Sequence, residues 1–309
     1  MDAARTVVWL GGRFVPLEEA RVSFFDAGLQ HGVGLFETMV ARRGRVFRLR
    51  AHLERLAASA AALRLTESLR LDALESAIQA AVVEAGSADA RVRLTITGGD
   101  LSLLRAPGGP RPAPHLPTLA VVVQPQAPWP PSLHERGIRV LASDARANPA
   151  HPFEGHKTLN YWPRLSVLQD AAAAGADEAL WFCTQGRLVS ACVANVFLVR
   201  DGRLITPPAW SPEEPTPVRP GVTRAAVLEL ARAEGLPVSE EWSAVQDVLA
   251  AGELFLTNST WGVLPVTHLE RHIVGSGRPG EVTSRLRALY EAMVDDEVGT
   301  SARAPDENS

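Results

Sequence analysis

The stretch HKTLNYW at residues 156–162 contains Lys157, the only lysine in the chain. The chain has 31 basic residues, so this one lysine stands against 30 arginines. Arginine supplies positive charge almost anywhere, but its pKa stays above about 12, so it cannot lose a proton and attack a carbonyl carbon. A lysine amine can do so once its pKa is lowered. Lys157 is therefore either a surface residue that drift has not replaced or an amine that the chain needs for its chemistry.

The residues next to Lys157 favour a chemical role. The lysine follows a loop, and Tyr161 and Trp162 lead from it into a predicted helix with an apolar face. An amine at a strand or loop edge, shielded by aromatic side chains, has the lowered pKa that Schiff-base chemistry requires. The stretch is thus suited to an aldehyde cofactor such as pyridoxal 5'-phosphate (PLP).

Two further stretches are suited to the phosphate of such a cofactor. PGVTR at residues 220–224 sets a glycine turn, free backbone N–H groups and the Thr223 hydroxyl at the start of a predicted helix. Helix N-termini bind anions because their first N–H groups lack partners and the helix dipole is positive there. TNST at residues 257–260 follows a predicted strand and offers more hydroxyl and amide groups. Either stretch alone is typical of an ordinary cap, but with Lys157 they form a coherent phosphate-plus-amine site.

Composition and charge exclude several other classes of protein. The 31 basic and 35 acidic residues give a net charge of −4 at pH 7, without the basic excess of a nucleic-acid-binding protein. No apolar run reaches the ~18 residues of a membrane span, and the N-terminal MDAAR lacks signal-peptide features. Cys183 and Cys192 are too few for a disulfide framework and wrongly spaced for structural zinc. We therefore expect a soluble, cytoplasmic protein with no nucleic-acid or membrane partner.

Two other motifs carry little weight. GSGRPG at residues 275–280 has the spacing of a dinucleotide-binding turn. Only 29 of the 309 residues follow it, too few for the strand and acid that such a fold requires. His151 and His156 lie five residues apart in a loop without a third ligand. We therefore interpret the glycine motif as a turn and expect no metal site.

The pattern of the chain predicts two α/β domains. A length of 309 residues corresponds to about two domains, and the 46% of apolar residues suffices for two cores. Hairpin signals alternate with helical periodicity, as at residues 49–63 and 71–85, and prolines at 125–131 separate two predicted strands. We predict an N-terminal α/β domain at residues 1–127, a proline-rich linker at 128–131, a C-terminal domain at 132–294 and a disordered tail at 295–309.

A series of motifs in a fixed order resembles the class IV aminotransferases, which are fold-type IV PLP enzymes. That family includes branched-chain and D-amino-acid aminotransferases and 4-amino-4-deoxychorismate lyase. The resemblance extends over roughly residues 5 to 292, and its specificity lies in the order of the motifs. They are GVGLFET (32–38), HLERL (52–56), HKTLN (156–160), GADEAL (175–180), ANVF (194–197), PGVTR (220–224), LFLTNS (254–259) and GVLPV (262–266).

The resemblance implies a fold, a cofactor and an oligomeric state. It implies a small N-terminal α/β domain, a larger pseudobarrel-like C-terminal domain, PLP in the cleft between them and a homodimer. Lys157 would bind the cofactor covalently and then move the proton at the substrate Cα. The cofactor phosphate would be bound by Arg55, Val222, Thr223 and Ser259. The substrate would contact Phe36, Ser259 and Thr260, with the backbone turn around the last two facing its carboxylate.

The chain departs from the family at the pyridine ring of the cofactor. The family has a glutamate beside the ring nitrogen, and counting back from Asn195 this position falls on Ser190. A carboxylate keeps the nitrogen protonated, whereas a neutral hydroxyl cannot hold that charge, and residues 186–199 contain no acid. We therefore expect Ser190 to contact PLP with a less protonated ring, giving slow transamination that Ser190→Glu accelerates. The chain also lacks an arginine after Thr97-Gly98-Gly99, which speaks against a D-amino-acid enzyme.

Three functions remain open on the sequence. The first is PLP-dependent transfer of an amino group between an amino acid, with branched-chain substrates among the candidates, and a 2-oxo acid. The second is a lyase that removes pyruvate from 4-amino-4-deoxychorismate, because TNS at residues 257–259 is similar to the lyase members of the family. The third is a non-catalytic or PLP-free binding protein on the same fold, which Ser190 favours and Lys157 with Arg55 opposes.

Overall fold

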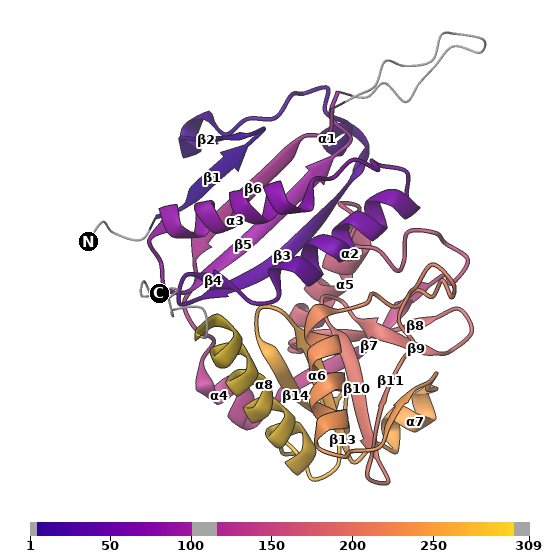
Figure 1. The fold of residues 1–309 in the computed structure, drawn as a ribbon. Helices are drawn as coiled ribbons and strands as arrows, with labels where there is room; N and C mark the ends of the chain where they lie inside the picture. The colour runs from indigo at the N-terminus through magenta and orange to yellow at the C-terminus, as the bar shows by residue number, and fades with distance from the viewer. Residues whose placement is uncertain (1–4, 101–115, 300–309) are drawn as a thin grey trace, which may run out of the picture. The chain divides into compact units, whose positions relative to one another are not determined.

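The computed structural model describes residues 5–100 and 116–299 of the chain. They divide into two compact units (Figure 1). The first unit comprises Met1–Ala127 and His156–Asn160, and the second comprises Pro128–Gly155 and Tyr161–Ser309. Each unit contains a sheet and several helices, so the predicted α/β class is confirmed. Among the described residues, no helix combines the length and apolar character that a membrane crossing requires.

The first unit is built on a six-stranded sheet in the order β2-β1-β6-β5-β3-β4. All of its strand pairs are antiparallel. The β1–β2 hairpin turns at Gly11 and Gly12, which have φ angles of 57° and 101° that favour glycine. The strands are β1 (Val7–Leu10), β2 (Arg13–Val15), β3 (Gly34–Arg42), β4 (Arg45–Val46), β5 (Ala90–Thr97) and β6 (Leu119–Pro125).

Helices α2 (Leu49–Ala62) and α3 (Leu71–Ala85) cover one face of this sheet (Figure 1). Their apolar residues recur every three to four positions, so one stripe of each helix faces the strands. Leu53 and Leu56 of α2 and Ile78 of α3 are fully buried in this core. The 3-10 helix η1 (Leu17–Glu19) and the short helix α1 (Ala27–His31) precede β3.

The segment that carries Lys157 belongs to the first unit, which differs from the predicted division at residue 127. Phe36 N donates a hydrogen bond to Lys157 O at 2.9 Å, and Leu159 N donates to Gly34 O at 2.9 Å. β4 pairs with β3 only at its far end, at Ala41 and Arg42. The beginning of β3 therefore keeps unpaired backbone groups on one edge, and residues 157–159 satisfy them.

The second unit contains a nine-stranded sheet in the order β12-β11-β10-β13-β14-β7-β8-β9, with β15 paired to β14. The pairs β11–β12, β14–β7 and β7–β8 are parallel, and the others are antiparallel. β9, at one end of this order, also lies beside β10, so the sheet curls back on itself as a pseudobarrel. The strands are β7 (Ile138–Ala147), β8 (Glu178–Cys183), β9 (Leu188–Ala191), β10 (Asn195–Arg200), β11 (Arg203–Thr206), β12 (Val238–Glu240), β13 (Glu253–Asn258), β14 (Gly262–Leu269) and β15 (His272–Ile273).

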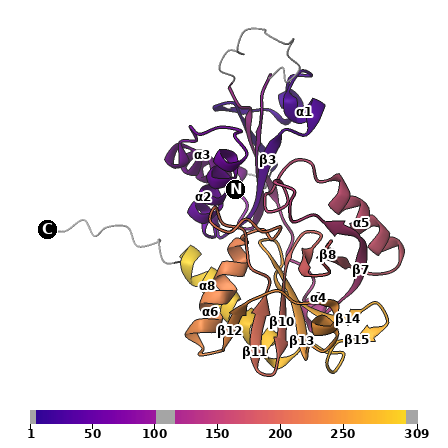
Figure 2. The same cartoon turned by 90° about the vertical axis from the view of Figure 1, so that its right-hand side faces the viewer.

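Helices pack on this curled sheet. α6 and α8 lie side by side against β13 (Figure 2), and α5 packs against β7 and β8. On the paired strands β10 and β13 the rings of Phe197 and Phe255 are stacked with centroids 4.9 Å apart. The helices are α4 (Pro131–Arg136), α5 (Trp162–Ala173), α6 (Val222–Ala233), α7 (Val245–Leu249) and α8 (Glu281–Gly299).

Two predicted boundaries of the C-terminal domain differ from the structure. The predicted linker at 128–131 is packed in the second unit, because Trp129 Nε1 donates to Thr260 O at 2.9 Å and Pro131 begins α4. Helix α8 continues to Gly299 instead of ending at 294, because Val294 and Val298 extend its buried stripe by one more turn. Residues 300–309 of the predicted tail lie outside the described residues.

Candidate active site

Lys157 lies against an aromatic ring in the first unit. Its Nζ is 3.9 Å from the centroid of the Phe36 ring, and the Arg93 guanidinium carbon is 3.5 Å from the same centroid. Cations over an aromatic face are attracted by the ring quadrupole. The predicted shielding by Trp162 is wrong, because that side chain is 76% exposed at the start of α5. Phe36 shields the amine instead, since β3 pairs with the lysine segment.

Gly34 is the residue that allows this close pairing. A Cβ at Gly34 would lie 2.5 Å from Ile96 O and 2.6 Å from Leu159 Cδ1, closer than real Cβ atoms come to either. On the other side of the lysine, His156 Nδ1 is 2.9 Å from Ser59 Oγ of α2, and both residues are buried. The lysine segment is therefore fixed at both ends within the first unit.

A buried ion pair lies next to Phe36 in the sequence. Arg55 of α2 donates from Nε to Glu37 Oε1 at 2.8 Å and from Nη2 to Oε2 at 2.5 Å. His52 Nδ1 is 2.9 Å from the same Oε2. Burial opposes ionisation of Glu37, but the Arg55 charge and the His52 hydrogen bond hold the pKa of that carboxyl well below its usual range. Arg55, predicted to bind phosphate, is thus held in place by a charged carboxylate.

His52 is held in its neutral form. Burial lowers the pKa of His52, and the positive charges of Arg55 and Lys157 lower it further, against the opposing effect of Glu37. A neutral ring that faces a carboxylate through Nδ1 carries its proton there, so Nδ1–H donates to Glu37 Oε2. His52 and Arg55 together give Glu37 three hydrogen bonds.

The second unit contains the predicted phosphate site at the start of α6. Gly221 is the N-cap of α6 and makes no side-chain cap hydrogen bond, so the first N–H groups, at Val222 and Thr223, are not capped by a side chain. Thr223 is buried, and its Oγ1 is 3.4 Å from the Tyr290 hydroxyl. A Cβ at Gly221 would lie 2.1 Å from Asn195 Oδ1, so a larger residue here would displace Asn195 or the cap itself. These features suit a bound anion.

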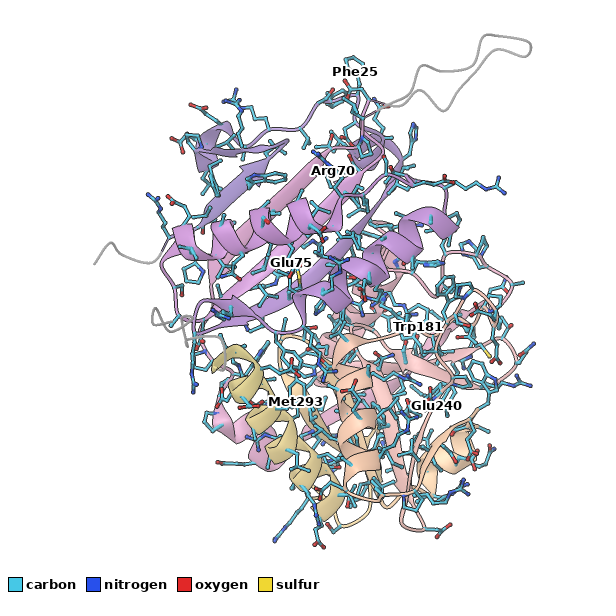
Figure 3. All side chains as sticks on the ribbon, viewed as in Figure 1. Phe25, Arg70, Glu75, Trp181, Glu240 and Met293 are labelled. Carbon is cyan, nitrogen blue, oxygen red and sulfur yellow. The ribbon has the colours of Figure 1, made fainter. Side chains whose placement is uncertain are left out.

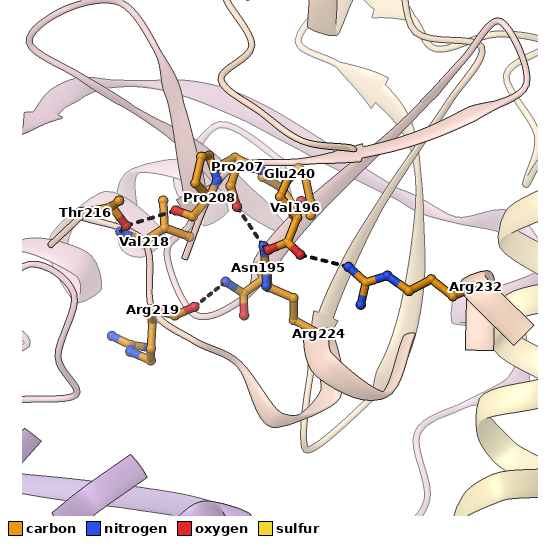
Figure 4. A network of polar contacts seen from close by, with 11 residues as sticks. Asn195, Val196, Pro207, Pro208, Thr216, Val218, Arg219, Arg224, Arg232 and Glu240 are labelled. Atoms are coloured by element: carbon orange, nitrogen blue, oxygen red, sulfur yellow. Dashed lines mark hydrogen bonds and ion pairs between the residues drawn. The ribbon is translucent and has the colours of Figure 1, made fainter. Parts of the chain in front are cut away.

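A polar network fixes the loop that enters α6 (Figure 4). Asn195 Nδ2 donates to Arg219 O at 2.9 Å, directly before the helix. Arg224, in the first turn of α6, donates to Pro207 O at 2.9 Å and to Glu240 Oε2 at 2.8 Å. Arg232 donates to the other oxygen of Glu240 at 3.0 Å. The start of α6 is therefore held to strands β10 and β12.

The turn after β13 is ordered by Asn258. Its Oδ1 accepts hydrogen bonds from Thr260 N at 2.9 Å, Thr260 Oγ1 at 2.9 Å and Trp261 N at 3.1 Å. These bonds fix the backbone of Ser259 and Thr260, which were predicted to bind phosphate and substrate. On the same strand, Thr257 Oγ1 is buried and has no hydrogen-bond partner among the described residues. A buried hydroxyl without a partner suits a polar ligand here.

Ser190 contacts an arginine that the sequence did not single out. Arg164, in the first turn of α5, donates from Nη1 to Ser190 Oγ at 2.8 Å and to Ala191 O at 2.9 Å. Its guanidinium carbon lies 4.3 Å from the centroid of a Trp181 ring. The only sequence signal was that Arg164 follows Lys157 by seven residues in the same motif region.

Two other titratable groups of this region have structural roles. The Glu178 carboxylate accepts N–H bonds from Ala179, Cys192 and Val193 at 2.8 to 3.0 Å, although burial raises its pKa. Burial also raises the pKa of the Cys192 thiol to about 12, so it is not a nucleophile at neutral pH. Within residues 5–100 and 116–299, no group of three or more His, Cys, Asp or Glu side chains is arranged to hold a metal.

The predicted site residues thus fall into two groups. The first unit holds Lys157 and Phe36 in contact, with Arg55 bound to the neighbouring Glu37. The second unit holds Ser190 on β9, Val222 and Thr223 at the start of α6, and Ser259 and Thr260 after β13. Tyr161 contacts two segments that flank this group, because it donates to Cys192 O at 3.2 Å and its ring centroid lies 5.8 Å from the Arg219 guanidinium carbon. Taken separately, the amine of the first unit is of the type that reacts with an aldehyde, and the uncapped helix and the unpartnered hydroxyl of the second unit suit a phosphate or another polar group.

Comparison with known proteins agrees with this geometry. The profile of the class IV aminotransferases matches residues 34–269. A Methanocaldococcus jannaschii protein provisionally named a branched-chain-amino-acid aminotransferase is 32% identical over 287 residues, which cover 92% of this chain and 95% of that protein. The crystal structure of the Escherichia coli branched-chain amino acid aminotransferase has a TM-score of 0.85 at 27% identity, covering 93% and 94% of the two chains. The enzyme of that name from T.th., solved with pyridoxamine 5'-phosphate, has a TM-score of 0.83 at 28% identity and 93% coverage of both chains.

Proposed function

The chain belongs to the class IV aminotransferase family, and from that premise we propose that it is a PLP-dependent enzyme that transfers an amino group between an amino acid and a 2-oxo acid. The observation that carries this proposal is Lys157, the only lysine of the chain, whose Nζ lies 3.9 Å from the centroid of the Phe36 ring. An enzyme that needs a side-chain amine for covalent chemistry must keep a lysine, because arginine cannot replace it in this role.

Lys157 is the residue that acts on the substrate. PLP, when bound, withdraws electrons from the substrate Cα and so weakens its Cα–H bond. Lys157 Nζ would hold the cofactor through its aldehyde group, and the same amine would take the Cα proton and return it. The Phe36 ring lies against Nζ, and the hydrogen bond from Phe36 N to Lys157 O holds the backbone of the lysine.

The remaining predicted residues bind and orient. In the proposed enzyme the phosphate is held by the Arg55 guanidinium and by groups of the second unit. Glu37 fixes the plane of that guanidinium through two hydrogen bonds, which supports a directed contact to an anion. Ser190 contacts the pyridine ring, and Phe36 contacts the substrate. The groups of the second unit are the N–H groups of Val222 and Thr223, the hydroxyls of Thr223 and Ser259, and the Ser259–Thr260 turn that faces the substrate carboxylate.

The proposed amino donors are branched-chain amino acids, and the proposed assembly is a cytoplasmic homodimer. The substrate proposal rests on the names of the Methanocaldococcus jannaschii and Escherichia coli relatives. A panel of leucine, isoleucine, valine, glutamate and aromatic amino acids, each offered with 2-oxoglutarate, tests it by product analysis. Faster turnover of the branched-chain donors supports the proposal, and preference for another class contradicts it.

A lyase that releases pyruvate from 4-amino-4-deoxychorismate is the second candidate function. The observation that favours it is the TNS stretch at residues 257–259, which resembles the lyase members of the family. Release of pyruvate from that substrate, without any 2-oxo acid acceptor, supports the lyase. The non-catalytic alternative is set aside because the chain belongs to a family of enzymes and retains Lys157.

Covalent loading of Lys157 tests the proposed function directly. The chain incubated with PLP should absorb near ~410–430 nm, a property of the bound cofactor, and should lose this band on borohydride treatment. Mass spectrometry should then locate the cofactor on Lys157. Lys157→Ala and Lys157→Arg should both lose the band, although the second variant keeps a positive charge over Phe36. A reducible adduct in either variant would contradict the assignment, since the cofactor would then be bonded to the N-terminal amine and not to a lysine.

A further inference from the structure

The Ser190 hydroxyl is bonded on one side only. Its oxygen accepts a hydrogen bond from Arg164 Nη1 at 2.8 Å, and an arginine side chain can only donate. The single hydroxyl proton of Ser190 must therefore point to a different acceptor. Among the described residues Ser190 Oγ has no second hydrogen-bond partner, although the residue is only 7% exposed. A buried donor without an acceptor calls for a ligand atom with a lone pair.

The charges around Ser190 disfavour any further positive charge. The Arg164 side chain is only 12% exposed, and desolvation together with the nearby Arg219 guanidinium lowers the pKa of Arg164. The Glu154 carboxylate is 3.5 Å from Arg164 Nη2, on the side of the guanidinium that does not face Ser190. The Glu178 carboxylate already accepts hydrogen bonds from three backbone N–H groups, and burial raises its pKa. The Cys192 thiol, also close to Arg164, adds no negative charge at neutral pH, because burial raises its pKa to about 12.

We infer that Arg164 sets Ser190 as a hydrogen-bond donor to the pyridine nitrogen of PLP and so keeps that nitrogen unprotonated. This inference rests on the proposed function, and it names the group that takes the place of the glutamate expected at position 190. An unprotonated pyridine nitrogen has a lone pair and accepts the Ser190 proton. A protonated nitrogen would bring a second positive charge beside Arg164 in a buried site, which costs free energy.

Arg164 is therefore a positioning residue that acts through Ser190. A neutral ring withdraws fewer electrons from the substrate Cα than a protonated ring. The base Lys157 then removes the Cα proton against a higher barrier, and overall turnover is slow. The same reasoning changes the expectation for Ser190→Glu. A carboxylate at position 190 would lie beside the Arg164 guanidinium and pair with it, so the single substitution cannot fully protonate the ring.

The protonation state of the ring is measurable without turnover. PLP labelled with 15N in its ring is bound to the full chain, and the nitrogen resonance is compared with that of free PLP titrated through its ring pKa. We expect the wild-type resonance at the unprotonated position. The double substitution Arg164→Met with Ser190→Glu should shift it to the protonated position, because it replaces a fixed cation with a carboxylate. The control Arg187→Gln, which removes a guanidinium that lies over Trp242, should leave it unchanged.

The outcomes separate this inference from the proposed function. Borohydride reduction of the same samples reports whether PLP is bonded to Lys157, independently of the ring. An adduct on Lys157 together with a protonated wild-type ring would overturn the inference and leave the proposed function intact. Absence of the adduct would overturn both. The wild-type resonance decides the question even where the double variant does not fold.

Discussion

In the proposed enzyme Arg55 binds two anionic groups, the Glu37 carboxylate and the cofactor phosphate. Removing it should weaken PLP binding by about 1.5–3 kcal/mol, because a charge-assisted contact to phosphate is lost. The simple variant Arg55→Ala would also leave Glu37 charged and buried, at a cost of about 3–5 kcal/mol in folding free energy. The double variant Arg55→Ala with Glu37→Gln is therefore compared with Glu37→Gln alone.

The comparison of these two variants isolates the contribution of the Arg55 guanidinium to PLP binding. Fluorescence titration with PLP should give a dissociation constant about 10 to 150 times larger for the double variant than for Glu37→Gln, which corresponds to the expected 1.5–3 kcal/mol. Equal dissociation constants would show that Arg55 only holds Glu37 and does not bind the phosphate.

His52 makes stability depend on pH in a predictable direction. Burial lowers the pKa of His52 below its ordinary value of about 6.5, so the unfolded chain binds this proton more readily than the folded chain. The contribution of His52 is fully present above pH ~6.5 and is lost as the pH falls from there toward the folded pKa. Across this window the free energy of unfolding should fall by about 1.4 kcal/mol per pH unit for this one proton.

The matched variant is His52→Asn, whose amide can still donate to Glu37 but does not titrate. Chemical denaturation of both proteins from pH 7.5 down to pH ~5, the region below the ordinary histidine pKa, gives the two slopes. At neutral pH the variant should have a smaller free energy of unfolding than the wild type. Its free energy of unfolding should also change less as the pH falls. Parallel curves for the two proteins would mean that another group accounts for the pH dependence.

The residues of the site were predictable to different degrees. Lys157 was predictable because it is the only lysine, a property that needs no structure. Glu37 was not, because its role depends on Arg55 arriving from a helix 18 residues later. Arg164 was missed for the same reason, since its contact with Ser190 spans 26 residues and crosses from a helix to a strand. A charge on a helix is usually solvated, so only the fold distinguishes such a residue from a surface arginine.

At the scale of elements, the local sequence pattern predicted a helix or strand correctly where that element buries one of its faces. Helix α3 runs from Leu71 to Ala85, as its periodicity predicted. The β1–β2 hairpin was predictable from Gly11 and Gly12. The pairing of residues 157–159 with β3 was not, because its hydrogen bonds come from backbone groups that any sequence possesses. The short strands β12 and β15 were missed, since two or three residues show no alternation.

The N-cap of α6 gives a prediction at this scale. Gly221→Ala would bring a Cβ to within 2.1 Å of Asn195 Oδ1, so either the cap or Asn195 must move. We expect a loss of about 1–3 kcal/mol in unfolding free energy, as for other overpacked sites, and weaker PLP binding from the displaced N–H groups. Gly252→Ala is the matched control, because its Cβ would meet only Val199 O at 3.6 Å.

Thermal unfolding and PLP titration check both parts of this prediction. The control should change neither measurement by more than the small effect of a surface substitution. If Gly221→Ala binds PLP as tightly as the control does, the start of α6 is not the phosphate site.

At the scale of the whole molecule, two separate segments of the chain form the first unit, Met1–Ala127 and His156–Asn160. The prolines at 125–131 predicted a boundary near the observed one, because proline interrupts strands and leaves a compositional signal. The return of residues 156–160 leaves no such signal, since its anchors are the Ser59–His156 contact and two backbone hydrogen bonds. The consequence is functional: the proposed catalytic lysine belongs to one unit, and the proposed helix N-terminus for phosphate belongs to the other.

The proposed homodimer has a candidate surface in the first unit. Leu17, Val22, Phe24, Phe25 and Leu29 are 50–75% exposed within a short stretch of chain (Figure 3 labels Phe25). The stretch is held in place, because the buried Asp26 carboxylate accepts hydrogen bonds from Gly28 N, Thr97 Oγ1 and Thr118 Oγ1 at 2.7 Å. Soluble proteins rarely leave such an apolar cluster uncovered, and a second copy of the chain would cover it.

Substitution of this cluster tests the dimer. Phe24→Ser with Phe25→Ser removes the two rings, which contact each other edge to face at 6.2 Å, without touching Asp26. Sedimentation velocity should show a dimer for the wild type and a monomer for this variant at the same protein concentration, because the apolar area buried between copies is lost. Ile273→Ser, at an exposed apolar position on β15, is the control and should remain dimeric. A dimeric double variant would place the interface elsewhere, and a monomeric wild type would refute the homodimer itself.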